Sequence, residues 1–464
     1  MKASHTRGAI RVSFDHPGVV SDAGLVPLMR LAHDAGLGWL ADKHIRLGGS
    51  LGSNAGAKIG SIVAGMAMGA STIDGLARIR HGGMSRLFAG MRAPSTLGSF
   101  LRYFSIGHVR QAQLVSRLVL INLVAGTPLL LPGVDQVAYV DIDSKIKEVF
   151  GPRKEGARFG YTQVRGLNYL LATLSTPLTA PVILASRLRG GNATSARGAS
   201  SLLREALTAA RACGAHGMLI VRADSAFFTG EIIATIRAAG AFFSVTARQS
   251  AHVREAINDI PEQHWRPVVY DRPIYDSDTQ AWITHGEIAE TGLTAFTNTT
   301  QNPGRKITAR LIVRRYRIAR DRDQQGELFP VYRYHAVFTD SRLDPITAEA
   351  CHRGRAGCIE PLFAELNASA LAHLPSGRFA ANAAWLTLAC LTHNLTRTLG
   401  CLAGRQFAKA RTPTLRERLI HLAAVVVRQA HGIRLRLPQH WPWHHAFTRL
   451  FDLAHAPPPP APCH

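Results

Sequence analysis

The chain has 464 residues, which at about 100–200 residues per domain predicts more than one structural unit. Hydrophobic residues make up 46% of it, so a wholly disordered chain is excluded. The 54 Lys and Arg residues exceed the 31 Asp and Glu residues by 23, which indicates a polyanionic partner, nucleic acid before membrane. This charge argues against a secreted disulfide scaffold and against an enzyme for small neutral metabolites.

The cysteines and apolar runs indicate the compartment. None of the six cysteines forms a Cys-x-x-Cys pair, so neither a zinc ribbon nor a thioredoxin-like dithiol is indicated. The amino terminus lacks an apolar signal core. The longest apolar stretch, 118–131, is interrupted by Asn122, Gly126 and Pro128 and is too short to span a bilayer. We therefore expect a soluble cytoplasmic protein.

The positive charge is unevenly distributed along the chain. Residues 1–135 carry a net +8, residues 136–250 carry +7, and residues 350–464 carry +9. Residues 251–349 carry −1. The neutral stretch is therefore a candidate insertion with a role different from that of its basic flanks.

The front of the chain, over 22–130, is predicted to be mostly helical. Residues 57–70 are small and apolar, as in a buried helix, and Ser95 or Thr96 is expected to cap a helix that follows. A further helix is expected over 108–122. Arginines recur throughout, and they indicate either a solvated face or a DNA-binding helical region: Arg80, Arg86, Arg92, Arg102, Arg110 and Arg117.

From residue 137 the pattern becomes that of an α/β sheet. Strands are predicted at 137–143, 169–174, 180–188, 218–224 and 241–246, with helices at 200–215 and 230–240, the second capped by Thr229. Residues 251–340 are predicted to be rich in strands and include Arg314-Arg315-Tyr316-Arg317, an exposed strand or a DNA contact. Segments 344–371 and 380–399 look helical, and 456–462 is Pro-rich.

Three acidic residues stand out in this layout. Asp143 closes the first predicted strand and Asp224 the fourth, and in a β-β-β-α-β sheet these two strands lie side by side. Asp141, two residues earlier on the same face, is a rival to Asp143. Glu360 lies in the helical segment after the strand-rich stretch. Each acid alone suits a turn, a cap or a solvated face, but together they suit Mg²⁺, two of which can assist phosphodiester cleavage.

These residues resemble those of bacterial insertion-sequence transposases of the DDE type. The resemblance extends from about residue 10 to about residue 455 and is most specific in RADSAFF (222–228) and SGRFAANAAWL (376–386). It implies an α/β fold with an RNase H-like core and a β-rich insertion before the catalytic Glu. On this basis the chain divides into a helical DNA-binding region (1–135), the first part of the core (136–250), the insertion (251–340), the core completion with C-terminal helices (341–455) and a disordered Pro-rich tail (456–464).

The resemblance also assigns roles to residues. Asp143, Asp224 and Glu360 fall at the three catalytic, metal-binding positions, and Asp143 is preferred to Asp141 because Ser144 follows it. The implied cofactor is Mg²⁺, as two ions, with Mn²⁺ as a substitute. The implied partners are double-stranded transposon ends and target DNA, bound by a homodimer at the nucleoid. The expected DNA contacts are Arg80, Arg86, Arg92, Arg102, Arg110, Arg314, Arg315, Arg317 and Arg355.

The sequence departs from the family pattern near two of the acids. Lys145 replaces a common Thr, Asn367 replaces a usual Lys, and Ala356 replaces a usual Arg, with Arg355 one residue away. Pro361 follows the Glu and suits a helix that begins there, not one that runs through it. Two rival functions therefore remain: a catalytically impaired, transposase-derived DNA-binding protein, and another RNase H-like nuclease such as a junction resolvase.

Overall fold

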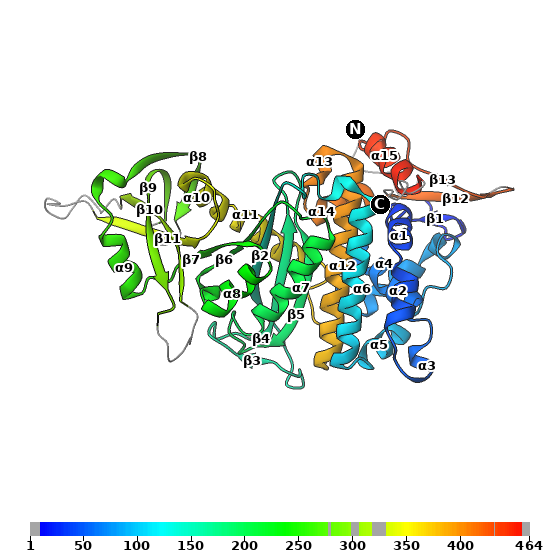
Figure 1. Ribbon diagram of the computed structural model, residues 1–464. Coiled ribbons are helices and arrows are strands. Elements are labelled where there is room, and N and C mark those ends of the chain that lie inside the picture. The colour runs from blue at the N-terminus through cyan, green and yellow to red at the C-terminus, as the bar shows by residue number, and fades with distance from the viewer. Residues whose placement is uncertain (1–9, 277–279, 298–305, 318–330, 431, 457–464) are drawn as a thin grey trace, which may run out of the picture.

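The computed structural model describes residues 10–276, 280–297, 306–317, 331–430 and 432–456 (Figure 1). These residues form a mixed α/β structure with one ten-stranded sheet, one three-stranded sheet and many helices, which confirms the predicted α/β class. The Pro-rich segment beyond residue 456 lies outside the described residues. Among the described helices, none is long and apolar enough to cross a membrane.

The front of the chain is helical, as predicted. Its α-helices are α1 (Leu25–Asp34), α2 (Leu37–His44), α3 (Gly49–Gly52), α4 (Ala55–Ala67), α5 (Pro94–Arg102) and α6 (Ile106–Gly126), with 3₁₀ turns η1 (Asp74–Arg80), η2 (Gly82–Arg86) and η3 (Pro128–Leu130). Helix α6 begins with a capping box in which the Ser105 side chain accepts from the His108 backbone. The predicted cap by Ser95 or Thr96 is wrong, because Pro94 itself occupies the first turn of α5.

The large sheet has the strand order β3-β4-β2-β6-β7-β11-β10-β9-β8, with β5 paired to β4. Strand β2 pairs antiparallel with β4 and parallel with β6, and β6 pairs parallel with β7. The bounds in this part of the sheet are β2 (Val137–Glu148), β3 (Arg158–Phe159), β4 (Arg165–Ser175), β5 (Val182–Gly190), β6 (Met218–Ala223) and β7 (Phe242–Thr246). The prediction that the first and fourth strands neighbour each other is confirmed by the pairing of β2 with β6.

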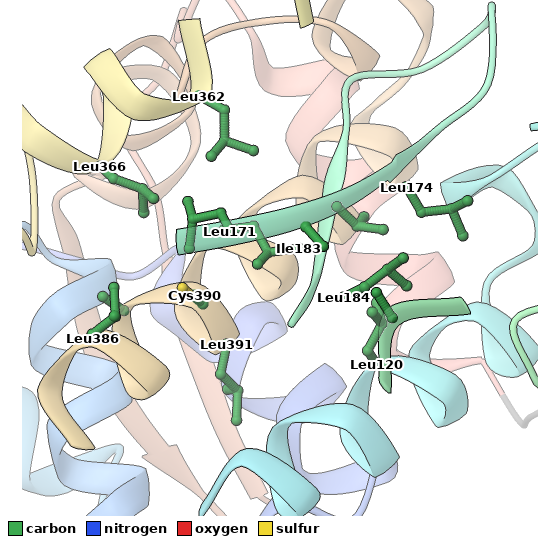
Figure 2. Close-up of a cluster of buried hydrophobic side chains, with 14 of the residues drawn as sticks. Leu120, Leu171, Leu174, Ile183, Leu184, Leu362, Leu366, Leu386, Cys390 and Leu391 are labelled. Carbon is green, nitrogen blue, oxygen red and sulfur yellow. The ribbon is translucent and has the colours of Figure 1, made fainter. Parts of the chain in front are cut away.

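Strand β4 forms the centre of the core. Ten consecutive residues of it, from Gly166 to Ser175, are buried, because other elements cover it on both faces. Leucines of α11 (Ala356–Asn367) and α12 (Phe379–Ala403) gather around Leu171 of β4 (Figure 2). Helix α12 also packs on α6 and α4, so it joins the sheet to the helical front (Figure 1).

The predicted strand-rich stretch extends the same sheet rather than starting a second one. Its strands are β8 (Arg266–Asp276), β9 (Ala281–Ala295), β10 (Ile307–Arg317) and β11 (Tyr332–Thr339). They are antiparallel, and β11 joins them to β7. Helix α9 (Ala251–Asn258) and the turn η5 (Glu262–His264) precede them, and α10 (Pro345–Arg353) follows. We refer to β8–β11 as the sheet extension.

The remaining elements complete the core and the end of the chain. Along the chain, the strands β5, β6 and β7 are connected by α7 (Ala199–Ala212), η4 (Ser225–Phe227) and α8 (Gly230–Ala238). Thr229 caps α8, as predicted. Beyond α12 come α13 (Arg405–Ala408), α14 (Thr412–Leu415), the π-helical turn η6 (Arg416–Ile420) and α15 (His444–His455). Strand β12 (Ala424–Gln429) pairs with β1 (Val19–Val20) on one side and with β13 (Gly432–Arg436) on the other to form the small sheet.

Candidate active site

The register of β2 against β6 brings two acids to one place. The parallel pairing ends at Asp141 and Arg222, and two residues further along each strand come Asp143 and Asp224. Asp224 directly follows β6. The prediction that Asp143 closes its strand is wrong, because β2 continues to Glu148 on its pairing with β4. Asp143 therefore lies where β2 loses one of its two neighbours.

Backbone and side-chain donors orient both carboxylates. Asp143 Oδ1 accepts from the Ser144 backbone N–H at 2.6 Å, and Asp143 Oδ2 accepts from Arg355 Nη1 at 3.1 Å. Asp224 Oδ1 accepts from the Ala226 backbone N–H at 2.9 Å and caps η4. Each carboxylate is held by at most one side-chain cation, so each retains oxygen lone pairs for another ligand.

The pKa of Asp143 reflects the crowding of two acids at one edge of the sheet. We refer to Asp143 and Asp224 together as the acidic edge. Burial raises the pKa of the Asp143 carboxyl, the Arg355 guanidinium opposes this rise, and the nearby Asp224 carboxylate adds to it. The side chain of Asp143 is 19% exposed, so solvent reaches it. Two carboxylates with a single guanidinium contact between them leave an excess of negative charge, which a cation would stabilise.

The rival acid Asp141 has a different environment. Its two oxygens accept from Arg222 Nε at 2.6 Å and Nη2 at 2.7 Å, and its side chain is fully buried. Arg222 also donates to the Cys351 backbone carbonyl and stacks on the Tyr139 ring at 4.3 Å. This bidentate pair satisfies both oxygens of Asp141, so its geometry is that of a structural ion pair.

Glu360 lies on α11, and its residue is exposed. Among the described residues, no three side chains of His, Cys, Asp or Glu are close enough together to hold a metal ion. The structure thus brings Asp143 and Asp224 together but does not bring Glu360 into a cluster with them. Pro361 lies inside α11 and not at its start, so the helix continues past a residue without a backbone N–H.

Two of the departures from the family pattern have defined contacts near Asp143. Arg355, just before α11, supplies the guanidinium that pairs with Asp143. Asn367 Nδ2 donates to the Tyr169 hydroxyl at 3.1 Å, and the Asp143 charge contributes to the raised pKa of Tyr169 after the larger effect of burial. The start of α11 is therefore linked to Asp143 through Arg355, and its end is linked to β4 through Asn367.

The predicted DNA-binding arginines of the helical front differ in exposure. Arg80, Arg102 and Arg110 are exposed, whereas Arg86 and Arg92 are partly buried. Arg110 lies 4.0 Å from Glu205. A hollow of about 760 Å³ lies between this front and the end of β2, and its lining includes Arg102, Lys147 and Lys154.

The arginines predicted in the sheet extension are mostly occupied. Arg314 Nη1 pairs with Glu349 at 2.7 Å, and Arg315 pairs with Glu262 and with Glu287. Both arginines are buried, and Arg315 also lies over the Trp265 ring at 4.1 Å. Arg317, the last residue of β10, is exposed. Three carboxylates therefore already neutralise the two inner arginines.

The sequence did not predict the partners of Asp141 and of Tyr169. Nothing in the spacing indicated that Arg222 would bind Asp141, although both residues lie on adjacent predicted strands. Tyr169 was assigned only to a strand, yet its hydroxyl lies next to the acidic edge. The available signal was the alternation of β2 and β4, which places residues 141, 143, 169 and 171 on one face.

The donor atoms of the acidic edge indicate which kind of metal ion it could bind. Asp143 and Asp224 offer only carboxylate oxygens, which are the ligands of hard cations such as Mg²⁺. Burial of Asp143 and the nearby Asp224 carboxylate together outweigh the stabilisation that Arg355 gives to the Asp143 charge, so the pair fits a divalent cation. The three acids as arranged do not form a complete ligand set among the described residues.

Two comparisons with known proteins concern the chain as a whole. A family model described as a transposase DDE domain, group 1, matches residues 2–458, which is nearly the whole chain. No curated protein matches the chain.

Proposed function

The chain belongs to the family of transposase DDE domains, and from that premise we propose that it moves an insertion sequence by metal-dependent cleavage and strand transfer of DNA. The observation that carries the proposal is the pairing of β2 with β6, which brings Asp143 and Asp224 to one partly exposed edge.

The strand order supports an RNase H-like core for this activity. Strands β5, β4 and β2 are antiparallel neighbours, and β6 and β7 continue from β2 in parallel. In chain order, with the two-residue β3 left aside, Asp143 lies on the first strand of the core and Asp224 directly follows the fourth. The sheet extension and α10 then separate Asp224 from Glu360, as expected for an insertion within the core.

We propose that Asp143 and Asp224 would hold Mg²⁺, with Mn²⁺ as a substitute. Glu360 is the third proposed ligand on the family pattern alone, because the described residues do not cluster it with the two Asp residues. When bound, the ions would activate the attacking oxygen and stabilise the leaving oxygen at phosphorus. Asp143 and Asp224 supply fixed oxygens, and Arg355 supplies a positive charge beside them that can contact a DNA phosphate. Asp141 holds Arg222 and so braces β2 against β6.

The basic surface supports DNA as the substrate. We propose that Arg80, Arg86, Arg92, Arg102 and Arg110 grip transposon ends, with the hollow between the helical front and β2 as part of the path. We leave Arg314 and Arg315 out of this set because carboxylates already neutralise them. Pairing of two ends requires two copies, so we propose a homodimer in that state, acting at the nucleoid.

A second function is favoured by specific observations. The absence of a three-acid cluster among the described residues, together with Pro361 inside α11, suits a transposase descendant that binds ends without cutting them. Both functions require DNA binding, so binding alone does not separate them.

The deciding experiment incubates the protein with a duplex that carries the element's own end, with Mg²⁺ or Mn²⁺. We expect nicking at the end and, with target DNA added, strand-transfer products. Binding without nicking under either metal would support the impaired protein. Nicking of branched DNA without strand transfer would support an RNase H-like resolvase.

A further inference from the structure

A second cluster of charge lies in a cavity away from the acidic edge. The cavity has a volume of about 480 Å³ and lies among β2, the loop between β4 and β5, and helices α10, α11 and α12. Neither Asp143 nor Asp224 lines it. Its charged and titratable lining residues are Arg222, Glu365, His393, Arg397, Lys409 and Arg411, with the thiols of Cys351 and Cys358 and the phenol of Tyr139.

Arg397 is the unusual group in this cavity. It lies on α12, its exposed fraction is 2%, and its Nε and Nη2 are buried with no hydrogen-bond partner among the residues that the structure describes. Burial lowers the pKa of Arg397, but an arginine still remains charged at neutral pH. A buried guanidinium without partners is costly, because it has lost the hydration that its charge requires.

The acidic residue of the cavity does not satisfy Arg397. Glu365 Oε2 accepts from the Thr412 backbone N–H at 3.0 Å and from the Thr412 hydroxyl at 2.6 Å. Its charge acts on Arg397 only through space, because the ion pairs formed by the described residues include none between these two side chains. Thr412 therefore holds Glu365 in place while Arg397 lacks direct contacts.

The other cations leave an excess of positive charge. Lys409 donates to the Pro177 carbonyl at 2.7 Å, and Lys409 and Arg411 are both exposed. Asp141 already neutralises Arg222. Burial and the charge of Arg397 lower the pKa of His393 to about 4, so this ring is neutral at pH 7. Three cations thus face one carboxylate, with the buried one innermost and the exposed ones at the surface.

We propose that this cavity binds a terminal or free phosphate group, held by Arg397 inside and by Arg411 and Lys409 at the rim. A phosphate offers several oxygens to the planar fork of an arginine, which is the partner that the guanidinium lacks. The two sources of this chemistry are free inorganic phosphate and the 5′-terminal phosphate of a DNA strand. The site itself does not depend on the proposed transposition; only the DNA source does.

The first test is calorimetric titration of the full chain with inorganic phosphate at constant ionic strength. We expect saturable binding, weakened at least ~100-fold by Arg397→Met, because a charge-assisted bidentate contact contributes about 3 kcal/mol. Arg397→Lys keeps the charge but not the planar fork of the guanidinium, so its phosphate affinity should lie between that of wild type and that of Arg397→Met. Arg416→Met is the matched control, since Arg416 is also largely buried but donates to the Ala67 carbonyl elsewhere.

Variants at the rim keep the test decisive if Arg397→Met does not fold. Arg411→Gln should weaken phosphate binding about tenfold, and Arg405→Gln, an exposed cation that does not line the cavity, should leave it unchanged. Glu365→Gln should tighten binding, because it removes the competing negative charge. A purely structural role for Arg397 predicts no change in phosphate binding in any of these variants.

A displacement experiment separates the two sources of phosphate. If the ligand is a DNA end, a short 5′-phosphorylated duplex should displace inorganic phosphate, and the same duplex without its 5′-phosphate should not. If neither duplex displaces it, the ligand is a free phosphate and the proposal of a phosphate site still stands. The proposal is overturned if phosphate does not bind saturably below about 10 mM, or if Arg411→Gln binds it as wild type does.

Discussion

The edge of the sheet core and the sheet extension differ in whether their charged side chains are paired. In the extension, Arg314 and Arg315 are each matched to carboxylates within 2.7 Å, and the segment is close to neutral overall. At the edge of the core, Asp143 and Asp224 lie near each other, and a single guanidinium, that of Arg355, contacts Asp143. Matched pairs hold a scaffold together, whereas unmatched charges mark the places where a ligand is required.

The largest effect that would test this contrast concerns catalysis. We expect Asp143→Asn or Asp224→Asn to reduce Mg²⁺-dependent end cleavage ~10³-fold or more, because each removes a metal ligand worth about 4 kcal/mol in the transition state. DNA affinity, measured by gel shift, should be retained. Glu148→Gln, an exposed carboxylate on the same strand, is the control and should cleave normally.

The next effect concerns stability and separates Asp141 from Asp143. We expect Asp141→Asn to destabilise the fold by about 3 kcal/mol in urea unfolding, because it leaves Arg222 buried without its partner. Asp143→Asn should instead preserve or raise stability at neutral pH, because burial, together with the nearby Asp224 carboxylate, disfavours the Asp143 charge by more than Arg355 stabilises it. Equal losses in the two variants would refute the distinction between a structural and a functional acid.

The third effect is a pH dependence that arises at His352 on α10. Its ring contacts the hydroxyls of Ser244 and Thr246, each at 2.9 Å, and burial with the charge of Arg355 lowers its pKa to about 3. The ring stays neutral in the folded protein while the unfolded chain binds a proton. Its contribution is therefore complete above the usual histidine pKa of 6.5 and is lost as pH falls toward 3.

The variant His352→Gln should flatten this acid sensitivity. Between about pH 6.5 and about pH 4 we expect its unfolding free energy to fall less steeply than that of wild type, by up to ~1 kcal/mol per pH unit. His393→Gln provides a comparison at another buried, neutral histidine. Identical pH profiles for His352→Gln and wild type would show that His352 does not anchor α10 to β7 in this way.

The smallest effect concerns Arg355 at the acidic edge. Arg355→Gln removes the guanidinium that competes with a metal ion for Asp143, so Mn²⁺ should bind about fivefold more tightly, which corresponds to ~1 kcal/mol for a partly exposed pair. Titration of Mn²⁺ by electron paramagnetic resonance measures this directly. If Arg355 mainly contacts DNA, the variant will lose DNA affinity and leave Mn²⁺ binding unchanged.

Much of the fold follows from patterns that the sequence displays. Alternation predicted β2, a strongly apolar run predicted β6, and the β-β-β-α-β order predicted that they neighbour each other, so the sequence alone places Asp143 and Asp224 together. The end of β2 was mistaken because its pairing with β4 continues after β6 has ended. The alternation of residues along one strand does not show where its neighbouring strand ends.

The partners of charged residues were the least predictable part. Arg315 looked like a surface arginine in an alternating strand, but its neighbours Glu262 and Glu287 come from segments 53 and 28 residues away. The isolation of Arg397 was equally hidden, because a single arginine in an apolar helix usually finds a carboxylate. Such pairings depend on tertiary contacts, and local periodicity does not encode them.

The most direct test of Asp224 as a metal ligand is the metal preference of end cleavage in the variant Asp224→Cys. A thiolate ligand disfavours Mg²⁺ and tolerates softer ions, so we expect no cleavage with Mg²⁺ and partial recovery with Mn²⁺. Wild-type protein should cleave with both metals. Undiminished cleavage with Mg²⁺ by Asp224→Cys would contradict the assignment of Asp224 to the catalytic metal site.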